Sequence, residues 1–374
     1  MKIFIVHAPA GAGHKRAAEA IKDAFDRAKT THDVRVINSL DYTNALFSRS
    51  YPWGYNFLVS KAPLLWGFFF YLTDFKLFQF FMRPVRRLTN FINCVGFYRF
   101  IIRERPDCVI STHFLSTDIV SNLKALKLYE GKHITCVTDY GVHAFWIAKH
   151  VDNYIVASEY SKKELIAKGI VAENIRILGI PVQHKFTEKM EREAAIRKLG
   201  LKEGLFNILV IGGGLGVGPI PALVKVISGC ACPFQLVVVC GNNKELVDEL
   251  QGLAVGAKMP VKVYGFVENV NELMDASDVM ISKPGGLSIS EALVKGLPVL
   301  VSSYIAGHEE KNLRFLENNN VGIGLKRVEE APQRLQTLYA SKDLLNSMKE
   351  RAKQLGKPSA ADDIALLALE MIKG

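Results

Sequence analysis

The sequence predicts an α/β protein with two Rossmann-like domains, and three observations lead to this fold class. Each half of the chain has a short apolar strand, at 2–6 and at 207–211, that runs directly into a glycine-rich loop. Further short apolar runs then alternate with segments of helical periodicity, which is the pattern of a parallel sheet covered by helices. The length of 374 residues also exceeds the about 250–300 residues that one hydrophobic core usually organises.

The remaining elements follow in order along the chain. In the first half strands are expected at 2–6, 34–37, 108–110, 134–137, 154–157 and 175–178, and in the second half at 207–211, 235–240, 261–264, 279–282 and 298–301. The first domain should span 1–182, because a strand ends and a charged stretch begins there. The second should span 183–358, and the amphipathic segment 359–374 should form a helix that packs back on the first domain.

Positive charge is unevenly distributed along the chain. The sequence holds 47 Lys and Arg against 37 Asp and Glu, a net charge of +10. Residues 1–182 hold 24 of the basic and 15 of the acidic residues, so this half carries +9 and the remainder carries +1. A negatively charged partner is therefore expected at the first domain. No recognised nucleic-acid-binding motif accompanies the charge, which favours an anionic membrane surface over nucleic acid.

The segment 51–105 departs from a plain Rossmann pattern because aromatic and basic side chains are concentrated in it. A polar stripe with helical spacing lies beside an apolar face, at Lys76, Gln79, Arg83, Arg87 and Asn90. Pro84 should kink this helix or start a new one. Two interpretations fit: a helix lying in a lipid interface, and a core helix with a solvated basic face. The uneven charge favours the membrane, with contacts expected from Trp66, Phe69, Phe70, Arg83, Arg86 and Arg87.

No segment is expected to cross a bilayer, since charged and polar residues interrupt the most apolar stretch, 62–82. The six cysteines show no C-x-x-C spacing, and the first apolar run goes straight into a glycine loop rather than a signal-peptide cleavage site. Reduced thiols without a disulfide framework or a zinc site are typical of a cytoplasmic protein. We therefore expect a peripheral protein on the cytoplasmic face of a membrane.

The first candidate site is Gly11-Ala12-Gly13-His14, at a strand-to-helix turn. Glycines allow close backbone approach, and the helix N-terminus attracts negative charge. His14 would project from the first helical turn into a cleft at the carboxyl edge of the sheet, where a neutral imidazole can take a proton from a hydroxyl nucleophile. A tight turn with a solvent-facing histidine is the alternative.

A second glycine loop, 212–218, also follows a strand and offers backbone N–H groups to a diphosphate, those of Gly213 and Gly214 among them. No Gly-Lys-Ser/Thr ends this loop, so it is not a Walker A motif. The next strand ends at Cys240-Gly241-Asn242, without the acidic residue that a dinucleotide-binding loop pairs with. A diphosphate site without dinucleotide recognition is the better interpretation.

The most specific pattern is the turn Lys283-Pro284-Gly285-Gly286 and the helix that begins there. The amides of Gly286, Leu287 and Ser288 can hold a phosphate group at the helix N-terminus. One turn further on, the carboxylate of Glu291 can accept hydrogen bonds from both hydroxyls of a ribose. The alternative is a tight connection with a surface glutamate.

This turn, with Gly265-Phe266-Val267 before it and Gly307-His308-Glu309-Glu310-Lys311-Asn312 after it, resembles the donor site of family 28 glycosyltransferases. The first half is similar to the branch of monogalactosyldiacylglycerol synthases and processive diacylglycerol glucosyltransferases. That similarity rests on the His14 loop, on Thr138-Asp139-Tyr140 with His143 and Trp146, and on 179–182. The motifs keep their order over almost the whole chain.

The resemblance implies a GT-B fold, two facing Rossmann domains with a UDP-sugar held mainly by the second. Phe266 and Val267 would contact the uracil, Glu291 the ribose, and the turn from Gly285 to Ser288 the phosphates. Glu309 and Asn312 fall where the family contacts the sugar. His308 stands where the family commonly has glutamine, which leaves glucose or galactose open.

The same resemblance implies inverting transfer of the hexose to the hydroxyl of diacylglycerol. His14 matches the position of the general base, and Asp139 is the second candidate for that role or a partner that orients and charges the base. His143 and Trp146 would lie on the acceptor side.

No Asp-x-Asp triplet occurs in the sequence, so a metal-held diphosphate has no evident ligands. Helix dipoles and backbone amides would neutralise the leaving UDP instead. We therefore expect transfer without a metal or another cofactor, with the UDP-sugar as donor substrate.

Two other functions stay open. The peptidoglycan branch of the same family transfers N-acetylglucosamine to a lipid-linked muramyl peptide, also at a membrane. The aromatic insertion and the Thr138-Asp139 pair favour the diacylglycerol branch. A non-catalytic protein that binds nucleotide-sugar or lipid is the other alternative, and the presence of His14, Asp139 and Glu291 argues against it.

Overall fold

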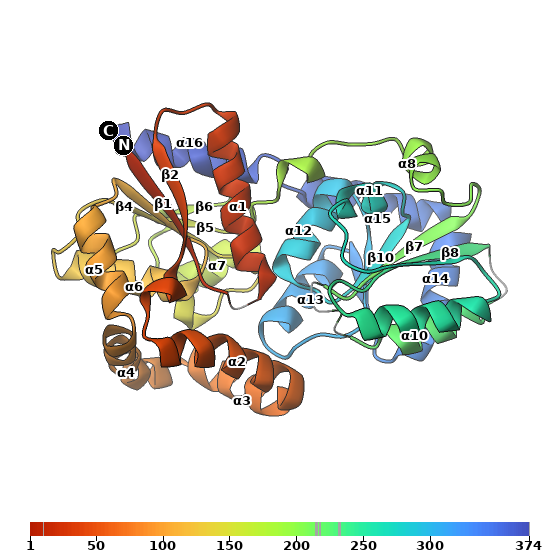
Figure 1. The fold of residues 1–374 in the computed structure, drawn as a ribbon, viewed down its shortest axis with the longest axis horizontal. Helices are drawn as coiled ribbons and strands as arrows, with labels where there is room; N and C mark the ends of the chain where they lie inside the picture. The colour runs from red at the N-terminus through yellow and green to blue at the C-terminus, as the bar shows by residue number, and fades with distance from the viewer. Residues whose placement is uncertain (10, 214–215, 217, 231–232, 374) are drawn as a thin grey trace. The chain divides into compact units, whose positions relative to one another are not determined.

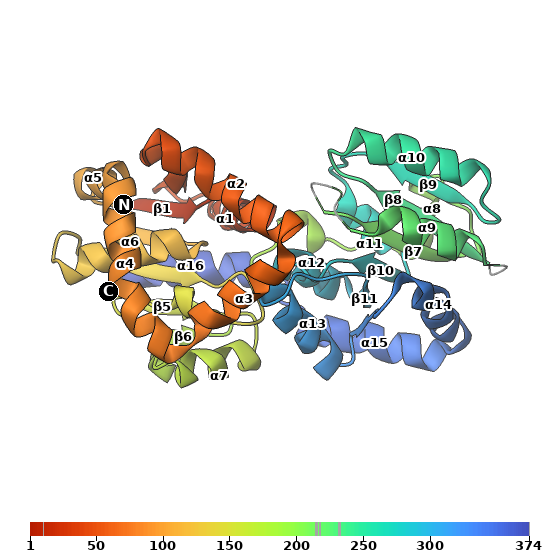
Figure 2. The same cartoon turned by 90° about the horizontal axis from the view of Figure 1, so that it is seen from below.

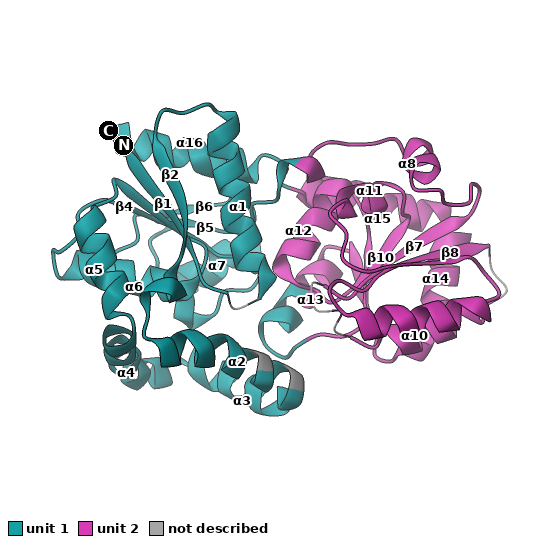
Figure 3. Ribbon diagram, in the orientation of Figure 1, with its two compact units in different colours: residues 1–184, 305–312, 357–374 teal, residues 185–304, 313–356 magenta. Residues whose placement is uncertain are grey.

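The computed structural model describes residues 1–9, 11–213, 216, 218–230 and 233–373, apart from the side chains of Asn56, Ser60 and Lys76. The chain forms two compact units (Figure 3). The first consists of Met1–His184, Ile305–Asn312 and Lys357–Gly374, and the second of Lys185–Tyr304 and Leu313–Gly356. The short segment 305–312 therefore belongs to the first unit, although it lies within the second half of the sequence.

The first unit is built on a six-stranded parallel sheet in the order β2-β1-β3-β4-β5-β6 (Figure 1). Its strands are β1 (Lys2–His7), β2 (Asp33–Asn38), β3 (Cys108–Ser111), β4 (Lys132–Cys136), β5 (Asn153–Ile155) and β6 (Ile175–Arg176). All six match strands that the sequence predicts, because strands covered on both faces consist of continuous apolar runs. The order reverses between β1 and β3, where Ile3 pairs with Val34 on one side and Cys108 on the other.

Helices cover both faces of this sheet. They are α1 (Ala12–Arg27), α2 (Ala45–Lys61), α3 (Pro63–Asp74), α4 (Lys76–Asn93), α5 (Val95–Glu104), α6 (Phe114–Ala125), α7 (Glu159–Ala167) and α16 (Ala360–Lys373). Gly11 adopts a φ of +87°, which suits glycine, and lets the chain turn from β1 into α1. The C-terminal helix α16 packs beside α1 in the first unit, with Ile364 and Ala368 fully buried in the same core cluster (Figure 1).

The second unit is also built on six parallel strands, in the order β12-β11-β10-β7-β8-β9. They are β7 (Phe206–Ile211), β8 (Phe234–Val239), β9 (Val261–Tyr264), β10 (Val279–Ser282), β11 (Val299–Val301) and β12 (Gly322–Gly324). Counted from β7, this is the order 3-2-1-4-5-6 of a Rossmann fold, with its reversal between β7 and β10. Strand β12 was not predicted from the sequence, since its Gly-Ile-Gly stretch offers only one large apolar side chain.

The helices of the second unit alternate with these strands. They are α8 (Arg192–Lys198), α9 (Ile220–Ser228), α10 (Lys244–Val255), α11 (Val270–Asp275), α12 (Gly286–Lys295), α14 (Ala331–Ala340) and α15 (Lys342–Leu355), together with the later part of α13 (His308–Asn318). Helix α12 ends at Gly296 in a left-handed conformation, as helices that stop at glycine commonly do.

Between β2 and β3, the segment 51–105 forms parts of four helices rather than one surface insertion. Helices α2, α3 and α4 lie side by side below the first sheet in Figure 1 and in front of it in Figure 2. Helix α5 is instead part of the core, where Phe97 and Ile101 are fully buried. The expectation that this whole segment faces a bilayer is therefore wrong for α5, whose aromatic side chains complete the first unit.

Helix α4 turns two residues of its polar stripe, Gln79 and Asn90, inward and much of its apolar face outward, while Arg83 is partly exposed and Arg87 is exposed. Gln79 and Asn90 are 4% and 5% exposed, whereas Phe80 and Phe81 are 74% and 63% exposed. The core-helix interpretation is therefore wrong, because it required the apolar face of this helix to be buried. No new helix starts at Pro84, because α4 continues through it to Asn93.

Exposed apolar side chains are concentrated on α2, α3 and α4. Of the 28 large hydrophobic residues that the described part of the chain exposes, 16 lie between Leu46 and Ile92. Exposed apolar patches of this kind mark contact surfaces for other molecules or for membranes. Over the described residues, no helix is both long enough and apolar enough to span a bilayer.

Candidate active site

Two loops at the carboxyl edge of the first sheet place His14 beside the residues that follow β3. His14 lies in the first turn of α1, and its Nδ1 atom is 2.7 Å from the carbonyl oxygen of Thr112. The same nitrogen lies 3.0 Å from Oγ1 of Thr138, which follows β4. Since β1 and β3 are the strands between which the order reverses, this is the edge where open α/β sheets bind ligands.

The carbonyl group of Thr112 determines the protonation of the His14 ring. Because a carbonyl oxygen can only accept, Nδ1 carries the proton and donates it to Thr112. The lone pair of the neutral ring is then on Nε2. Burial lowers the pKa of His14 below its ordinary value of 6.5, and the charge of Asp139 partly offsets this effect. A neutral ring with a basic Nε2 is what a general base requires near neutral pH.

Asp139 is held by the amide group of Asn312. The Nδ2 atom of Asn312 donates to Oδ1 of Asp139 at 2.9 Å, and its Oδ1 atom accepts from the backbone N–H of Tyr140 at 2.8 Å. Burial raises the pKa of Asp139 to about 6, against the lowering effects of the Asn312 hydrogen bond and the His14 charge. The carboxyl group of Asp139 therefore titrates well above the ordinary range of an aspartate.

A cavity of about 640 Å³ opens beside His14, and all the residues that line it belong to the first unit. Its walls come mainly from α2, α3, α4, α6 and the loop 139–146, and most of the lining side chains are apolar or aromatic. Nine residues that the sequence singles out line this cavity: His14, Trp66, Phe69, Phe70, Arg86, Asp139, His143, Trp146 and His308. The arrangement suits an apolar ligand that presents a hydroxyl group to His14.

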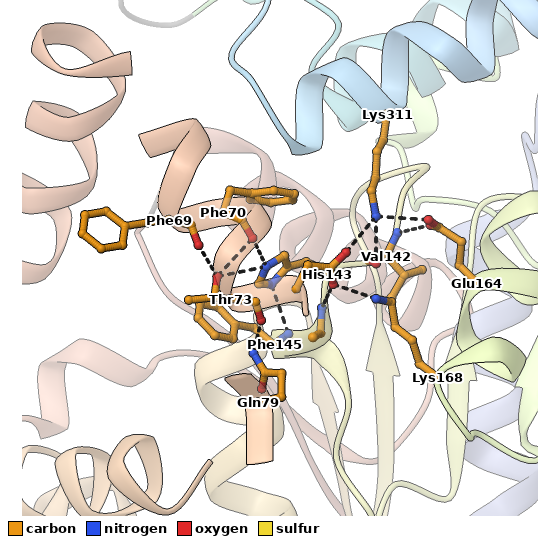
Figure 4. A network of polar contacts seen from close by, with 12 residues as sticks. Phe69, Phe70, Thr73, Gln79, Val142, His143, Phe145, Glu164, Lys168 and Lys311 are labelled. Carbon is orange, nitrogen blue, oxygen red and sulfur yellow. Dashed lines mark hydrogen bonds and ion pairs between the residues drawn. The ribbon is translucent and has the colours of Figure 1, made fainter. Parts of the chain in front are cut away.

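His143 attaches the end of α3 to the wall of the cavity (Figure 4). Its Nε2 atom lies 3.0 Å from the carbonyl oxygen of Phe70, to which it donates, and its Nδ1 atom accepts from the N–H of Phe145 at 3.1 Å. Burial lowers the pKa of His143 to about 4, so the ring is neutral. His143 therefore positions α3 and the loop after β4.

A partly buried ionic network lies next to His143 (Figure 4). Lys311 donates to Glu164 at 3.0 Å and lies 3.4 Å from Asp74, the last residue of α3. Asp74 also accepts from Lys168 at 2.6 Å and from the N–H of Ala144 at 2.8 Å. Burial opposes ionisation of Asp74, but Lys168 and Lys311 hold the pKa of its carboxyl group below its ordinary value. The network joins α3, α7 and the segment 305–312.

Arg86 of α4 points into the first unit rather than toward solvent. It donates to Asp118 of α6 at 3.0 Å, and Asn90 donates to the other carboxylate oxygen of Asp118 at 2.7 Å. The guanidinium group also stacks over the ring of Phe145, 5.1 Å from its centroid. Arg86 is therefore part of the cavity wall, while Arg87 is exposed and Arg83 partly exposed.

In the second unit, the turn from β10 into α12 has the geometry of an anion site. Gly285 is the N-cap of α12, and no side chain caps the helix. The first-turn amides of Gly286, Leu287 and Ser288 therefore have no capping side chain competing for them. Glu291 lies one turn further on and is 4% exposed.

The neighbouring strand ends carry the other residues expected to bind the donor. Gly213 follows β7 with a φ of +68°, and β7 is adjacent to β10 at the reversal of the strand order. Phe266 follows β9 and is 53% exposed, and Val267 is partly exposed. Gly214 lies outside the described residues.

Comparison with known proteins agrees with this arrangement. Residues 14–182 match the family model described as monogalactosyldiacylglycerol (MGDG) synthase, and residues 207–365 match that of the glycosyltransferase family 28 C-terminal domain. The chain is 30% identical over 388 residues to the chloroplastic monogalactosyldiacylglycerol synthase of Spinacia oleracea, covering 96% of this chain and 70% of that protein. The chain belongs to the monogalactosyldiacylglycerol synthase family of glycosyltransferases.

A bacterial relative and two solved structures extend the comparison. The processive diacylglycerol beta-glucosyltransferase of Bacillus cereus (strain AH187) is 29% identical, with 97% of this chain and 92% of that protein covered. MurG of Acinetobacter baumannii has a TM-score of 0.64 at 14% identity, covering 99% of this chain and 100% of that one. Anabaena HepE in complex with UDP-glucose has a TM-score of 0.58 at 14% identity, covering 99% of each. The fold of this glycosyltransferase is accordingly GT-B.

The segment 305–312 of the glycosyltransferase packs in the first unit, against α3 and the loop after β4. A Cβ atom on Gly307 would lie 2.5 Å from the Phe70 ring, and His308 is 6.2 Å from Trp66 between ring centroids. Glu309 is buried and accepts from the N–H of Ile305 at 2.7 Å. Asn312 is fully buried on Asp139. The residues that the resemblance assigns to the donor sugar thus contact the side of the molecule that carries His14.

Several residues of the site were not found from the sequence of the glycosyltransferase. Thr112 and His113 follow β3 directly, and polar residues at the end of a buried strand beside the His14 strand are a signal that could have indicated them. Asp118 gave no such signal, because its partners Arg86 and Asn90 come from a helix whose inward face the sequence does not reveal.

The described residues of the glycosyltransferase contain no cluster of three or more His, Cys, Asp or Glu side chains arranged to hold a metal ion.

Proposed function

We propose that this glycosyltransferase moves a hexose from a UDP-sugar to the free hydroxyl of diacylglycerol, with inversion, at a membrane surface. The observation that carries the proposal is the position of His14, whose Nε2 carries the lone pair of the ring, in the wall of a large, mainly apolar cavity. Diacylglycerol combines two apolar chains with one hydroxyl group, and that combination matches the cavity and the base. The names of the relatives, which include diacylglycerol in their substrate or product, support the same acceptor.

The transfer is a single displacement. The acceptor hydroxyl oxygen forms a bond to the anomeric carbon of the sugar while the bond from that carbon to the diphosphate oxygen breaks. Nε2 of His14 takes the hydroxyl proton, and UDP leaves with the bonding electron pair. Asp139, held by Asn312, lies in the same cavity wall, and its negative charge stabilises the imidazolium that forms.

The donor is proposed to bind at the carboxyl edge of the second sheet. The uncapped first turn of α12 and the turn at Gly213 offer N–H groups to the diphosphate, and Glu291 is placed to accept from the ribose hydroxyls. HepE, which has the same fold, binds UDP-glucose, and this supports a UDP-sugar as donor. Glucose and galactose remain the two candidates.

The exposed apolar faces of α3 and α4 are proposed to dock on the bilayer that contains the acceptor. Both helices also line the cavity, through Trp66 and Phe69 on α3 and Met82 and Val85 on α4. A lipid could therefore pass from the membrane to His14 without crossing bulk water. The cytoplasmic leaflet, whose surface is anionic, matches the excess of positive charge in residues 1–182.

The proposal is tested with purified protein, liposomes that contain diacylglycerol, and a panel of UDP-sugars, with products identified by mass and anomeric configuration by NMR. We expect a monohexosyl product from UDP-glucose or UDP-galactose with inverted configuration. Transfer to a lipid-linked muramyl peptide, and none to diacylglycerol, would instead identify the peptidoglycan reaction. Absence of any transfer with either acceptor would contradict the proposal.

His14→Ala should lower kcat by about 10²–10⁴-fold, because the proton of the hydroxyl loses its acceptor. The dissociation constant for UDP, measured by calorimetry, should stay within about twofold, since the variant leaves the proposed donor-binding groups intact. His150→Ala is a matched control, because His150 is exposed and is not among the residues that line the cavity. Turnover retained by His14→Ala would remove His14 from the role of base.

A further inference from the structure

Three buried N–H donors in the wall of the cavity have no acceptor. They are His113 Nε2, Trp66 Nε1 and Arg86 Nε, and within the described residues none of them has a hydrogen-bond partner. An unpaired buried donor is costly, so native structures seldom leave several together without a ligand to satisfy them. A cavity with mostly apolar walls and unpaired donors calls for a ligand that combines apolar bulk with acceptor atoms.

His113 is the best defined of the three donors. It is fully buried, and its Nδ1 atom accepts from the N–H of Leu115 at 3.1 Å as the N-cap of α6. Burial holds the pKa of His113 well below 6.5, so the ring is neutral and its single proton is on Nε2. The hydrogen bond to Leu115 therefore fixes Nε2 as a donor on the other side of the ring.

The rings of His113 and His14 are in contact, with their centroids 4.6 Å apart and their planes at 83°. The other rings packed on His113 are those of Phe114 at 4.1 Å and Tyr51 at 6.1 Å. A water molecule bound at Nε2 would need two or more polar partners, and the aromatic rings packed on His113 offer few. An acceptor atom of a ligand next to the reacting hydroxyl would satisfy Nε2 directly.

We propose that His113 donates from Nε2 to the carbonyl oxygen of the ester adjacent to the free hydroxyl of the acceptor, and that Trp66 Nε1 serves the second ester. His113 is then a specificity-determining residue that selects ester-linked lipids and holds their hydroxyl against His14. The ester carbonyls of a diacylglycerol accept and do not donate, and its acyl chains fill the apolar walls. This inference rests on the proposed function, since it takes diacylglycerol as the acceptor.

The test compares four acceptors of equal chain length in liposomes: diacyl, dialkyl, 1-alkyl-2-acyl and 1-acyl-2-alkyl glycerol, all with the hydroxyl at the third position. For the wild-type protein we expect kcat/KM to fall about tenfold whenever the second position carries an ether, because the His113 donor then stays unpaired. An ether at the first position should cost less, since the donor assigned to the second position, His113, is the one whose ring is in contact with His14.

His113→Asn is the informative variant. Asparagine is a preferred N-cap and can accept from Leu115 with its Oδ1 atom, but it has no donor at the position of Nε2. The ratio of kcat/KM between an ester and an ether at the second position should fall from about ten to about one. Trp66→Phe should reduce only the ratio at the first position.

His133→Asn is the matched control, because His133 is equally buried and bonds to Ser111 and His150 outside the residues that line the cavity. It should lower Tm without changing either ratio. A wild-type protein that uses ester and ether acceptors equally well, or a His113→Asn variant that keeps the preference, would overturn the inference and leave the proposed function standing. Failure of the wild-type protein to use any of the four acceptors would overturn the proposed function itself.

Discussion

At the scale of single residues, the site is defined by two side chains whose protonation the fold controls. Thr112 holds the proton of His14 on Nδ1, and Asn312 donates to Asp139. Burial pushes the two pKa values in opposite directions, down for the imidazole and up to about 6 for the carboxyl group. Because the two groups interact, the enzyme should show apparent pKa values that belong to the pair.

Asp139→Asn tests two effects of this carboxylate, its contribution to catalysis and its effect on the free energy of unfolding. The wild-type kcat/KM should fall as the pH drops below about 6, because Asp139 becomes protonated and no longer stabilises the imidazolium. The variant should be slower at pH 7.5, and its acid limb should move to lower pH, because only the imidazole of His14 then titrates and Asp139 no longer raises its pKa. The pH–rate profiles of both proteins measure this shift. An acid limb that is unchanged in the variant would assign the titration to another group.

The same substitution should stabilise the fold at neutral pH. The pKa of Asp139 is raised on folding, so the stability that the protonated group contributes is complete below about pH 4 and is lost as the pH rises through about 6. Asp139→Asn should therefore raise the free energy of unfolding by about 2 kcal/mol at pH 7.5 and by much less at pH 4. Urea unfolding at the two pH values measures this difference.

Asn312→Ala tests whether Asn312 acts on Asp139 or on the donor sugar. The hydrogen bond from Asn312 lowers the pKa of Asp139, so its removal should move the acid limb of kcat/KM to a higher pH by about one unit. The KM for the UDP-sugar should change little in that case. A large rise in this KM without a shift of the pH profile would favour direct contact with the sugar.

At the scale of elements, the orientation of helix α4 determines which side chains this part of the first unit exposes. Arg86 and Asn90 point inward and hold Asp118, while many of the apolar side chains of the helix lie outside. A helix in a water-soluble protein normally shows the opposite arrangement. Polar side chains of α4 face inward because the buried carboxylate of Asp118 requires hydrogen-bond donors, which Arg86 and Asn90 supply.

Replacing Phe80, Phe81 and Leu88 of α4 by Ser should detach the protein from liposomes. These side chains are 60% to 74% exposed, so their loss removes little packing within the unit. Each should weaken partitioning by about tenfold, given the about 1.5–3 kcal/mol gained on burying a large apolar side chain. Liposome flotation measures the effect, and circular dichroism checks that helicity is retained.

Leu366→Ser on α16 is the control for this experiment. Leu366 is 56% exposed and lies on the helix that covers α1, away from α2, α3 and α4 in the sequence. It should leave flotation unchanged. Binding that survives the triple substitution would show that the α4 face does not contact the membrane.

How far the sequence predicts this structure depends on which contacts an element makes. All the strands except β12 and the two glycine turns at Gly11 and Gly285 could be predicted, because local composition determines them. The orientation of α4 could not, since periodicity reveals two faces and not which one is buried. Nor could the pairing of Asn312 with Asp139, because the two residues are 173 positions apart and only the folded chain brings them together.

At the scale of the whole molecule, the excess positive charge and the proposed diphosphate site lie in different halves of the chain. The excess positive charge lies in residues 1–182, while the proposed diphosphate site lies in a nearly neutral half and relies on helix N-terminal amides. Ion pairs such as Arg86–Asp118 contribute nothing to this excess, since the net charge already counts both partners. The excess is suited to an anionic surface.

Exhaustive EDTA treatment should leave the initial rate of transfer within about twofold, because we propose that backbone amides and the α12 dipole, rather than a metal ion, stabilise the departing UDP. The measurement is a steady-state assay before and after dialysis against chelator, with Mg²⁺ and Mn²⁺ added back. Loss of activity that either ion restores would show that the leaving group needs a cation.

The position of 305–312 in the first unit limits where this enzyme can be truncated or joined to part of a relative. This stretch completes the wall against α3 and fixes Asp139, although it is encoded far from the rest of the first unit. A fragment cut near residue 182 would lose that wall, and a hybrid that exchanged second halves between relatives would replace it with a foreign one. With the proposed roles, acceptor and donor specificity are not expected to be independently exchangeable, and their divergence among relatives should be correlated at these eight positions.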